Sequence, residues 1–205
     1  MFSDAYGLTQ AVLDGRKTMT RRIIRNVIVT QELNEIDEDG DIGRADTRII
    51  IDRFSRYKVG EVVAVAQCYE EALSPLDWVN RLIYKDEPGW SNKMFVRADL
   101  MPHQIRITNV QVEKLQGISD EDVYKEGFEK ETVNNGWGNY AHHWEAILVY
   151  YDSIGKTREI RSPYPRDAFA ALIDRISGKG TWESNPYVFV YEFELVKQDG
   201  HEQIY

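Results

Sequence analysis

Apolar residues recur at helical spacing in two parts of the chain. In residues 3–14, Leu8, Ala11 and Val12 fall on one helical face, and Gly15 is placed to end that helix. Closer to the C-terminal end, a longer apolar stripe lies between a proline that can begin a helix and a glycine that can end it. This second set comprises Pro165, Ala168, Phe169, Leu172, Ile173, Ile176 and Gly178.

A third, shorter helix is predicted over residues 120–126 by its end signals. Ser119 followed by three acidic residues is typical of a capping-box start, and Gly127 provides a stop. Val123 then faces inward, and Glu126 falls in the last turn of this helix.

Alternating apolar residues predict the strands. The strongest pattern covers 187–196. Residues 105–112 alternate on either side of 108–109, which indicates one strand with a bulge. A buried strand is predicted from about residue 59 to Cys68. Two further runs predict a hairpin: 147–151 and 157–161.

Two segments interrupt this framework. Residues 31–46 are strongly acidic and contain two glycines, which indicates an exposed loop or a polar hairpin. The β-branched runs 27–29 and 49–51 are candidates for its two strands. We therefore expect one insertion near 27–56, and a second near 72–100, where prolines and aromatic residues are mixed.

The order of elements predicts the fold class. Strands and helices do not alternate regularly, which favours an α+β structure with an antiparallel barrel over a doubly wound sheet. A length of 205 residues fits one elaborated domain over 1–205, with a polar tail at 197–205.

Composition narrows the function classes. The chain has 25 basic and 34 acidic residues, a net charge of −9, so a highly basic nucleic-acid coat protein is not expected. Its single cysteine, Cys68, excludes an intramolecular disulfide and a cysteine-based zinc cluster. The four histidines lack metal-ligand spacing, and we expect neither a metal nor a cofactor. No apolar run approaches a membrane-spanning length, and we expect a cytoplasmic protein.

The most basic segment is 15–22, Gly-Arg-Lys-Thr-Met-Thr-Arg-Arg. It is not a phosphate loop of the Walker type, because the required second glycine is missing and the lysine does not directly follow glycine. Two interpretations are open. Lys17, Arg21 and Arg22 can bind phosphate or carboxylate groups, or the segment is a solvated basic turn paired with the acidic residues 31–46.

Aromatic residues offer a second kind of candidate. A ring exposed beside cations can stack on a nucleobase, although most aromatic residues are core or loop anchors. Trp182 and Tyr140 are the candidates, because each lies in a glycine-rich stretch with polar neighbours.

The eight-residue motif resembles the N-terminal signature of ASCH-domain proteins, which belong to the PUA-like superfamily. Three more blocks, 57–63, 105–127 and 169–193, resemble the longer phage- and bacteria-associated branch and occur in the expected order. The resemblance implies a small, mostly antiparallel PUA-like β-barrel with flanking helices and inserted loops. It also implies a cleft lined by the motif, and binding of RNA or a modified nucleotide.

One small ASCH branch is an amidohydrolase that removes the acyl group from acetylated cytidine. Matching the motif makes Lys17, Thr20 and Glu126 the catalytic set. The roles are chemically reasonable, since a lysine with a lowered pKa can activate a threonine hydroxyl and a glutamate can protonate the leaving amine. This chain is much longer than that branch. It also carries Gln67 where many relatives have an acid, which favours reading a base edge over proton transfer.

We therefore expect a domain that binds RNA or a modified nucleoside or nucleotide. The acidic composition favours a single nucleotide or a short single strand over a duplex. Glu126 is expected at the base. The other expected binding residues are Arg16, Thr18, Arg21, Arg22, Gln67 and Trp182. Two alternatives are an amidohydrolase acting on an N-acylated nucleoside such as N4-acetylcytidine, and a phage-derived interaction module whose basic motif satisfies helix carbonyls and buried acids.

Overall fold

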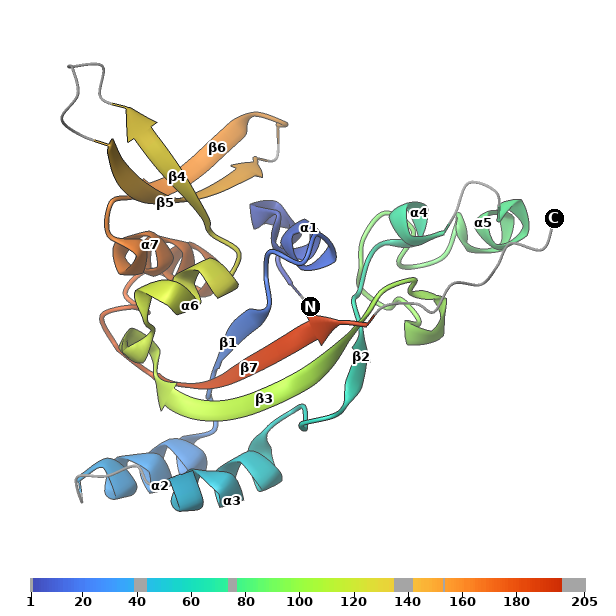
Figure 1. Cartoon of the computed structure of the whole chain (residues 1–205). Coiled ribbons are helices and arrows are strands. Elements are labelled where there is room, and N and C mark those ends of the chain that lie inside the picture. The colour runs from blue at the N-terminus through green and yellow to red at the C-terminus, as the bar shows by residue number, and fades with distance from the viewer. Residues whose placement is uncertain (1, 39–43, 74–76, 135–141, 153, 197–205) are drawn as a thin grey trace.

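The computed structural model describes residues 2–38, 44–73, 77–134, 142–152 and 154–196. Four of its strands form one antiparallel sheet in the order β1 (Met19–Ile23), β7 (Tyr187–Leu195), β3 (Gln104–Lys114) and β2 (Val62–Ala64). Three form a second antiparallel sheet in the order β4 (Glu129–Asn134), β5 (His142–Tyr151) and β6 (Thr157–Ser162). The first sheet curls as half of a barrel (Figure 1). The predicted α+β class with a barrel-like antiparallel sheet is confirmed.

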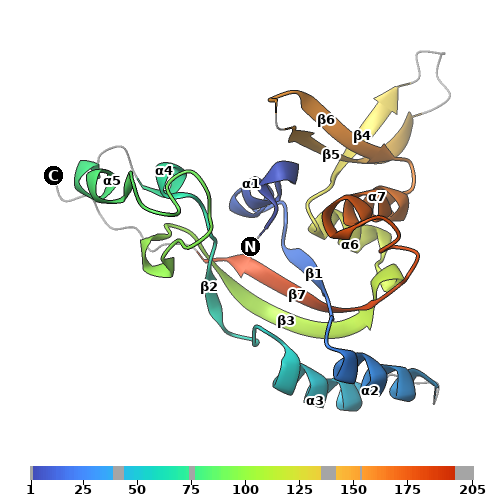
Figure 2. The same cartoon turned by 180° about the vertical axis from the view of Figure 1, so that it is seen from behind.

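Helices cover both faces of the curled sheet. Along the chain they are α1 (Leu8–Leu13), α2 (Val27–Glu38), α3 (Arg44–Phe54), α4 (Tyr69–Ala72), α5 (Trp78–Tyr84), α6 (Asp120–Lys125) and α7 (Pro165–Ser177). Short 3₁₀ helices are η1 (Asp4–Tyr6), η2 (Ala98–Leu100) and η3 (Leu115–Gly117). In both views α6, α7 and the second sheet lie on one side of the curled sheet, and α2 and α3 lie on the other (Figures 1 and 2). None of the helices in these described ranges is long and apolar enough to cross a membrane.

The central strand β7 supplies both main hydrophobic clusters. Side chains alternate across a strand, so successive residues of β7 point to opposite faces of the sheet. Val188 and Val190 pack with α7 and the second sheet. The aromatic residues between and beside them pack with α2, α3 and β3: Tyr187, Phe189, Tyr191 and Phe193. Because both of its faces are buried, β7 is apolar at nearly every position, which explains its strong sequence pattern.

Several local predictions are confirmed. The register of β3 against β7 shifts between Ile107 and Asn109, at the predicted bulge. The Ser119 hydroxyl accepts a hydrogen bond from Asp122 N at the start of α6. The hairpin predicted over 147–151 and 157–161 is the β5–β6 pair. In α7, Ala168, Phe169, Leu172 and Ile173 are buried as predicted, whereas Ile176 is exposed.

The two strands predicted at 27–29 and 49–51 are wrong, because both segments are helical and belong to α2 and α3. Val29 and Leu33, one helical turn apart, are fully buried, while Val27 is 69% exposed. A helical face accounts for this pattern, and the run of β-branched residues concealed it. Residues 39–43 of the acidic segment lie outside the described residues.

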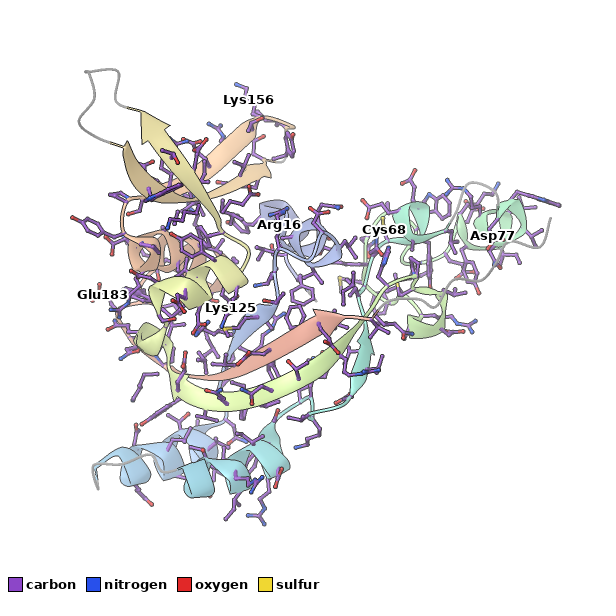
Figure 3. The ribbon with its side chains drawn as sticks, viewed as in Figure 1. Arg16, Cys68, Asp77, Lys125, Lys156 and Glu183 are labelled. Atoms are coloured by element: carbon purple, nitrogen blue, oxygen red, sulfur yellow. The ribbon has the colours of Figure 1, made fainter. Side chains whose placement is uncertain are left out.

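The strand predicted up to Cys68 is also too long. β2 ends at Ala64, and Cys68 is the residue that precedes α4 (Figure 3). After β2, Tyr69 N donates to Gly89 O, within the second predicted insertion. The predicted polar tail at 197–205, and Tyr140, lie outside the described residues.

Candidate functional site

A cavity of about 560 Å³ wraps around β1, which is the edge strand of the curled sheet. The motif residues that line it are Lys17, Thr20, Arg21 and Arg22, and Glu126 joins them from the end of α6. The cavity touches both faces of β1, because Thr20 and Arg22 point to one face and Arg21 to the other. The structure therefore brings together all three residues that the sequence matched to the amidohydrolase set.

Lys17 lies in the connection between α1 and β1. Its backbone N–H donates to Ala11 O at 2.8 Å, and its side chain is 2% exposed. Its Nζ lies 2.5 Å from Glu126 Oε2 and 2.8 Å from the Glu126 carbonyl oxygen. Gly127 has a φ of +108°, and a Cβ there would lie 3.4 Å from the Lys17 Cβ. This positive φ lets the chain turn directly after Glu126 and pass close to the lysine.

Burial dominates the electrostatics of Lys17. Loss of hydration lowers the pKa of its ammonium group, and the charge and hydrogen bond of Glu126 oppose that effect only in part. The nearby guanidinium groups of Arg22 and Arg21 lower the pKa further. Lys17 is therefore a buried lysine with a lowered pKa held against a carboxylate, an arrangement found both at sites that exchange protons and in structural ion pairs.

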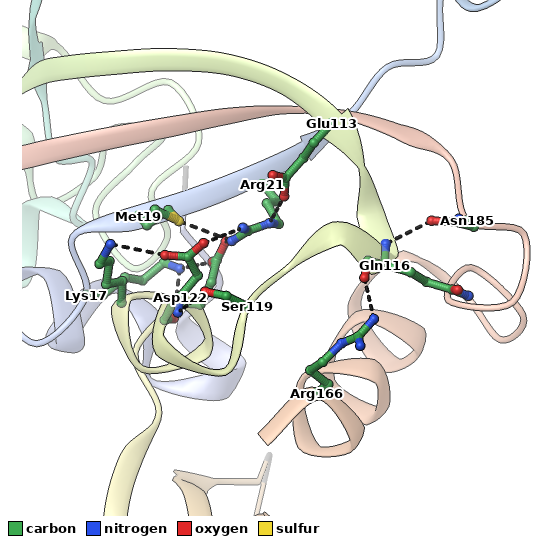
Figure 4. Close-up of polar contacts among 11 residues, drawn as sticks. Lys17, Met19, Arg21, Glu113, Gln116, Ser119, Asp122, Arg166 and Asn185 are labelled. Carbon is green, nitrogen blue, oxygen red and sulfur yellow. Dashed lines mark hydrogen bonds and ion pairs between the residues drawn. The ribbon is translucent and has the colours of Figure 1, made fainter. Parts of the chain in front are cut away.

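Arg21 is surrounded by three carboxylates, which we call the carboxylate cluster: Glu113, Asp122 and Glu126. The Arg21 side chain is 1% exposed, and its nitrogens lie 2.8, 3.2 and 3.2 Å from these three residues in that order. A further N–H points to Met19 Sδ at 3.1 Å (Figure 4). Burial disfavours the charged guanidinium, but Glu126 and Glu113 outweigh it and raise its pKa. The sequence predicts that Arg21 binds ligand phosphate, whereas in the structure its guanidinium pairs with these three acids.

Positive charge at the cavity surface comes from three other residues. Arg22, Arg25 and Arg56, which we call the rim arginines, all line the cavity and are exposed. Arg22 also lies over the ring of Phe2, with its guanidinium carbon 5.8 Å from the ring centre. On the opposite wall the cavity is apolar, lined by the α7 residues Phe169, Leu172, Ile173 and Ile176. The cavity thus combines a cationic rim with an apolar wall.

Thr20 is the uncharged polar member of the set. It pairs with Tyr191 across β1 and β7. Within the part of the chain that the structure describes, its hydroxyl makes no hydrogen bond to another residue. A hydroxyl in a cavity that a buried lysine also lines can accept a hydrogen bond from a ligand or donate one to it, or act as a nucleophile when a base removes its proton.

The other expected binding residues lie elsewhere. Arg16 forms surface ion pairs with Asp14 and Glu129, and Figure 3 shows it beside α1. The backbone N–H of Thr18 donates to Lys125 O. None of the residues Arg16, Thr18, Gln67 and Trp182 lines the cavity in the described structure.

Gln67 and Trp182 are in contact with other residues of the fold and do not face the cavity. Gln67 is buried, its backbone N–H lies 3.3 Å from Met101 Sδ, and its Oε1 has no hydrogen-bond partner among the described residues. Trp182 packs edge-on against Phe169, and its backbone N–H donates to Asp174. Trp182 therefore supports the cavity wall from behind.

Sequence reasoning missed Arg25, Arg56 and Phe2. Arg25 closes the basic segment three residues after Arg22, and that spacing could have suggested it. Arg56 lies just after α3, in the predicted insertion, and no local signal connects it with the motif. Among the described residues no three His, Cys, Asp or Glu side chains gather in a way that could hold a metal ion.

Comparison with known proteins adds no family assignment. No protein-family model matches the chain. No curated protein matches it. No solved structure matches it.

Proposed function

We propose that the cavity around β1, which is the larger of two adjoining cavities, binds a modified nucleotide or a nucleotide of a short single-stranded RNA. In this proposal the chain is of the ASCH, PUA-like type. The observation that carries this proposal is the rim of Arg22, Arg25 and Arg56 beside the aromatic ring of Phe2. Guanidinium groups bind phosphate through paired N–H donors, and aromatic rings stack on bases. Both kinds of group meet at one cavity, and a nucleotide carries both partners.

Charge and size favour a small ligand. The whole chain has a net charge of −9, so a long polyanion would be repelled away from the rim. The cavity has a volume of about 560 Å³, which is large enough for one nucleotide and its substituent. A cytoplasmic location, where such nucleotides occur, is part of this proposal.

The second candidate function is deacylation of an N-acylated nucleoside, because Lys17, Thr20 and Glu126 line the same cavity. Thr20 Oγ1 would bond to the acyl carbon as its proton passes to Lys17 Nζ. The bond from that carbon to the exocyclic nitrogen would break as Glu126 gives this nitrogen a proton. Water would then cleave the acyl–threonine ester.

This reaction needs Lys17 neutral and Glu126 protonated at its start. This neutral pair differs from the ion pair by one proton, which has moved from Lys17 Nζ to Glu126 Oε2 across a contact of 2.5 Å. Burial lowers the pKa of the Lys17 ammonium group, which favours the neutral amine that this step needs. The contact between Lys17 and Glu126 supports this candidate, because it provides one group that can take a proton and one that can give a proton.

One experiment separates the two functions. Cytidine monophosphate and N4-acetylcytidine are titrated into the protein by calorimetry, and free cytidine is followed by chromatography. Binding that weakens in Arg25→Ala but not in the surface control Arg158→Ala supports the proposed site. Release of cytidine that is lost in Thr20→Val, with N4-acetylcytidine still bound, establishes the deacylase. No binding of either compound contradicts both functions.

A further inference from the structure

A second, smaller cavity of about 150 Å³ adjoins the first. Four aromatic residues line it, Phe2, Tyr57, Tyr191 and Phe193. They come from the N-terminal segment, the turn before β2, and the central strand β7. The remaining walls are small and aliphatic, with Ala64 and Ala66 at and after β2, and Ile105 and Ile107 in β3.

The two cavities meet at four residues. Phe2, Thr20, Arg22 and Arg56 line both. The alternation of β1 explains the junction, because Thr20 and Arg22 project to the same face of the sheet as Tyr191 and Phe193. A ligand that spans both cavities would contact the Phe2 ring and the guanidinium groups of Arg22 and Arg56.

The smaller cavity has few free polar groups. The Tyr191 hydroxyl already lies 3.0 Å from Ser55 Oγ and accepts a hydrogen bond from Arg56 N at 3.2 Å. The Arg56 guanidinium carbon lies 5.5 Å from the centre of the Tyr57 ring. Thr20 and Tyr57 supply the other uncharged hydroxyls of the lining. Such a lining suits a flat, weakly polar ring and holds it by stacking and apolar contact.

We propose that the smaller cavity holds the heteroaromatic ring of the ligand, and that Arg22 and Arg56 at the junction bind its phosphate. The sugar, which links the ring to the phosphate, then lies at the junction, and a substituent on the ring extends toward the larger cavity, which Lys17 and Glu126 line. This inference rests on the proposed function and adds where each part of the nucleotide binds. A ring in this position is unstacked from its neighbours, so the ligand is a mononucleotide or a nucleotide turned out of a single strand.

Three probes and one filled variant test the placement. Cytidine monophosphate, adenosine monophosphate and ribose 5-phosphate are titrated into the wild-type protein and into Ala66→Leu, which fills the smaller cavity. Ala98→Leu, at an exposed position in η2, is the matched control. In the wild type we expect at least one nucleotide to bind about tenfold tighter than ribose 5-phosphate, the gain of one stacked base. In Ala66→Leu that gain should disappear, while ribose 5-phosphate binds as before.

Other outcomes overturn the inference in distinguishable ways. If Ala66→Leu keeps the wild-type preference for a nucleotide, the ring binds outside the smaller cavity although the proposed function stands. If the wild type binds none of the three probes, the proposed function fails and this placement fails with it. Thermal melting of each variant shows whether it folds, and Ala66→Val replaces Ala66→Leu if the larger side chain unfolds the protein. A reduced gain in Ala66→Val supports the placement, and an unchanged gain opposes it.

Discussion

Lys17 Nζ contacts both the side chain and the backbone carbonyl of Glu126, 109 residues later in the chain. Glu126 is the residue that ends α6, so its carbonyl is one of those left unpaired within the helix. The lysine therefore caps α6 and neutralises the glutamate at the same time. This pair connects the α1–β1 segment to α6 beneath the larger cavity.

The two partners of this pair are not equivalent, and we expect Glu126→Gln to destabilise the protein more than Lys17→Met. Glu126 retains Arg21, 3.2 Å away, when the lysine is removed. Lys17 keeps no carboxylate contact among the described residues when Glu126 is removed, and an uncompensated buried charge costs about 3–5 kcal/mol. Urea unfolding of both variants measures the order. Equal losses, or a larger loss in Lys17→Met, would contradict it, and the double variant should recover part of the loss in Glu126→Gln.

The pH dependence of stability should carry a signature of Lys17. Burial lowers the pKa of its ammonium group below 10.5 in the folded state. Between that lowered value and 10.5 the unfolded chain binds more protons than the folded one, so the free energy of unfolding contributed by Lys17 rises with pH. The difference in unfolding free energy between the wild type and Lys17→Met should therefore grow through the alkaline range. Urea unfolding at a series of pH values checks it, and a difference independent of pH would refute the lowered pKa.

Asp122 should give the stability a second pH dependence, in the acidic range. Burial disfavours its ionised form, but the hydrogen bond from Lys125 and the charge of Arg21 outweigh this and lower its pKa. A lowered carboxyl pKa gives stability that is present above the unfolded value of 3.8 and is lost as the pH falls through the folded value. Asp122→Asn should lose stability near neutral pH and become similar to the wild type in strong acid. Asp86→Asn, at an exposed position just after α5, is a suitable control.

The rim arginines should govern the salt dependence of nucleotide binding. Arg22→Ala and Arg25→Ala each remove one guanidinium from the cavity, and a hydrogen bond to a charged group contributes roughly 1.5–3 kcal/mol, or at least about tenfold in affinity. The slope of affinity against salt concentration should also become shallower. Calorimetry with cytidine monophosphate at several salt concentrations measures both effects. Arg158→Ala, whose partner is Asp152 on the distant hairpin, should change neither.

The parts of this fold that could be predicted are those with both a period and an end signal. In α7 the stripe from Ala168 to Ile173 lies between Pro165 and Gly178, and Ser119 marks α6 by a hydrogen bond that local sequence encodes. α2 has an N-terminal signal in Asn26, whose Oδ1 accepts a hydrogen bond from Ile28 N at 3.0 Å, but its β-branched residues hide the helical period. The burial of Val29 beside the exposed Val27 fits a helical face. Tertiary packing decided that segment.

The candidate site shows the same division. The motif contains Lys17, and in the structure this lysine contacts Glu126, the residue with which the resemblance to ASCH domains groups it. The same motif predicts that Arg21 binds phosphate, whereas Arg21 pairs with carboxylates in the structure. A run of basic residues does not reveal which of its cations meet buried carboxylates. Arg56 was missed, because it reaches the cavity only through the packing of α3 against β3. Contacts between residues distant in sequence were the part that the pattern alone could not supply.

Lys93, in the second insertion, holds the backbone of Phe2, a residue that lines both cavities. Its Nζ binds the Phe2 carbonyl oxygen, Asp4 Oδ1 and Thr9 Oγ1, and the Lys93 side chain is 12% exposed. Phe2 lines both cavities and Lys93 lines neither. Lys93 therefore positions the Phe2 ring by holding the Phe2 backbone. Lys93→Met keeps most of the apolar length and removes all three hydrogen bonds.

We expect Lys93→Met to weaken binding of cytidine monophosphate by about tenfold or less, since Phe2 would lose its anchor while every other lining residue stays. Lys156→Met, in the exposed β5–β6 turn, is the control (Figure 3). Phe2→Ala should weaken binding at least as much, and adding Lys93→Met to it should cause little further loss, because both changes act on the same ring. If the two losses add in full, Lys93 acts on binding by a route other than Phe2. Unchanged affinity in Lys93→Met with a lower melting temperature would show that the anchor serves stability alone.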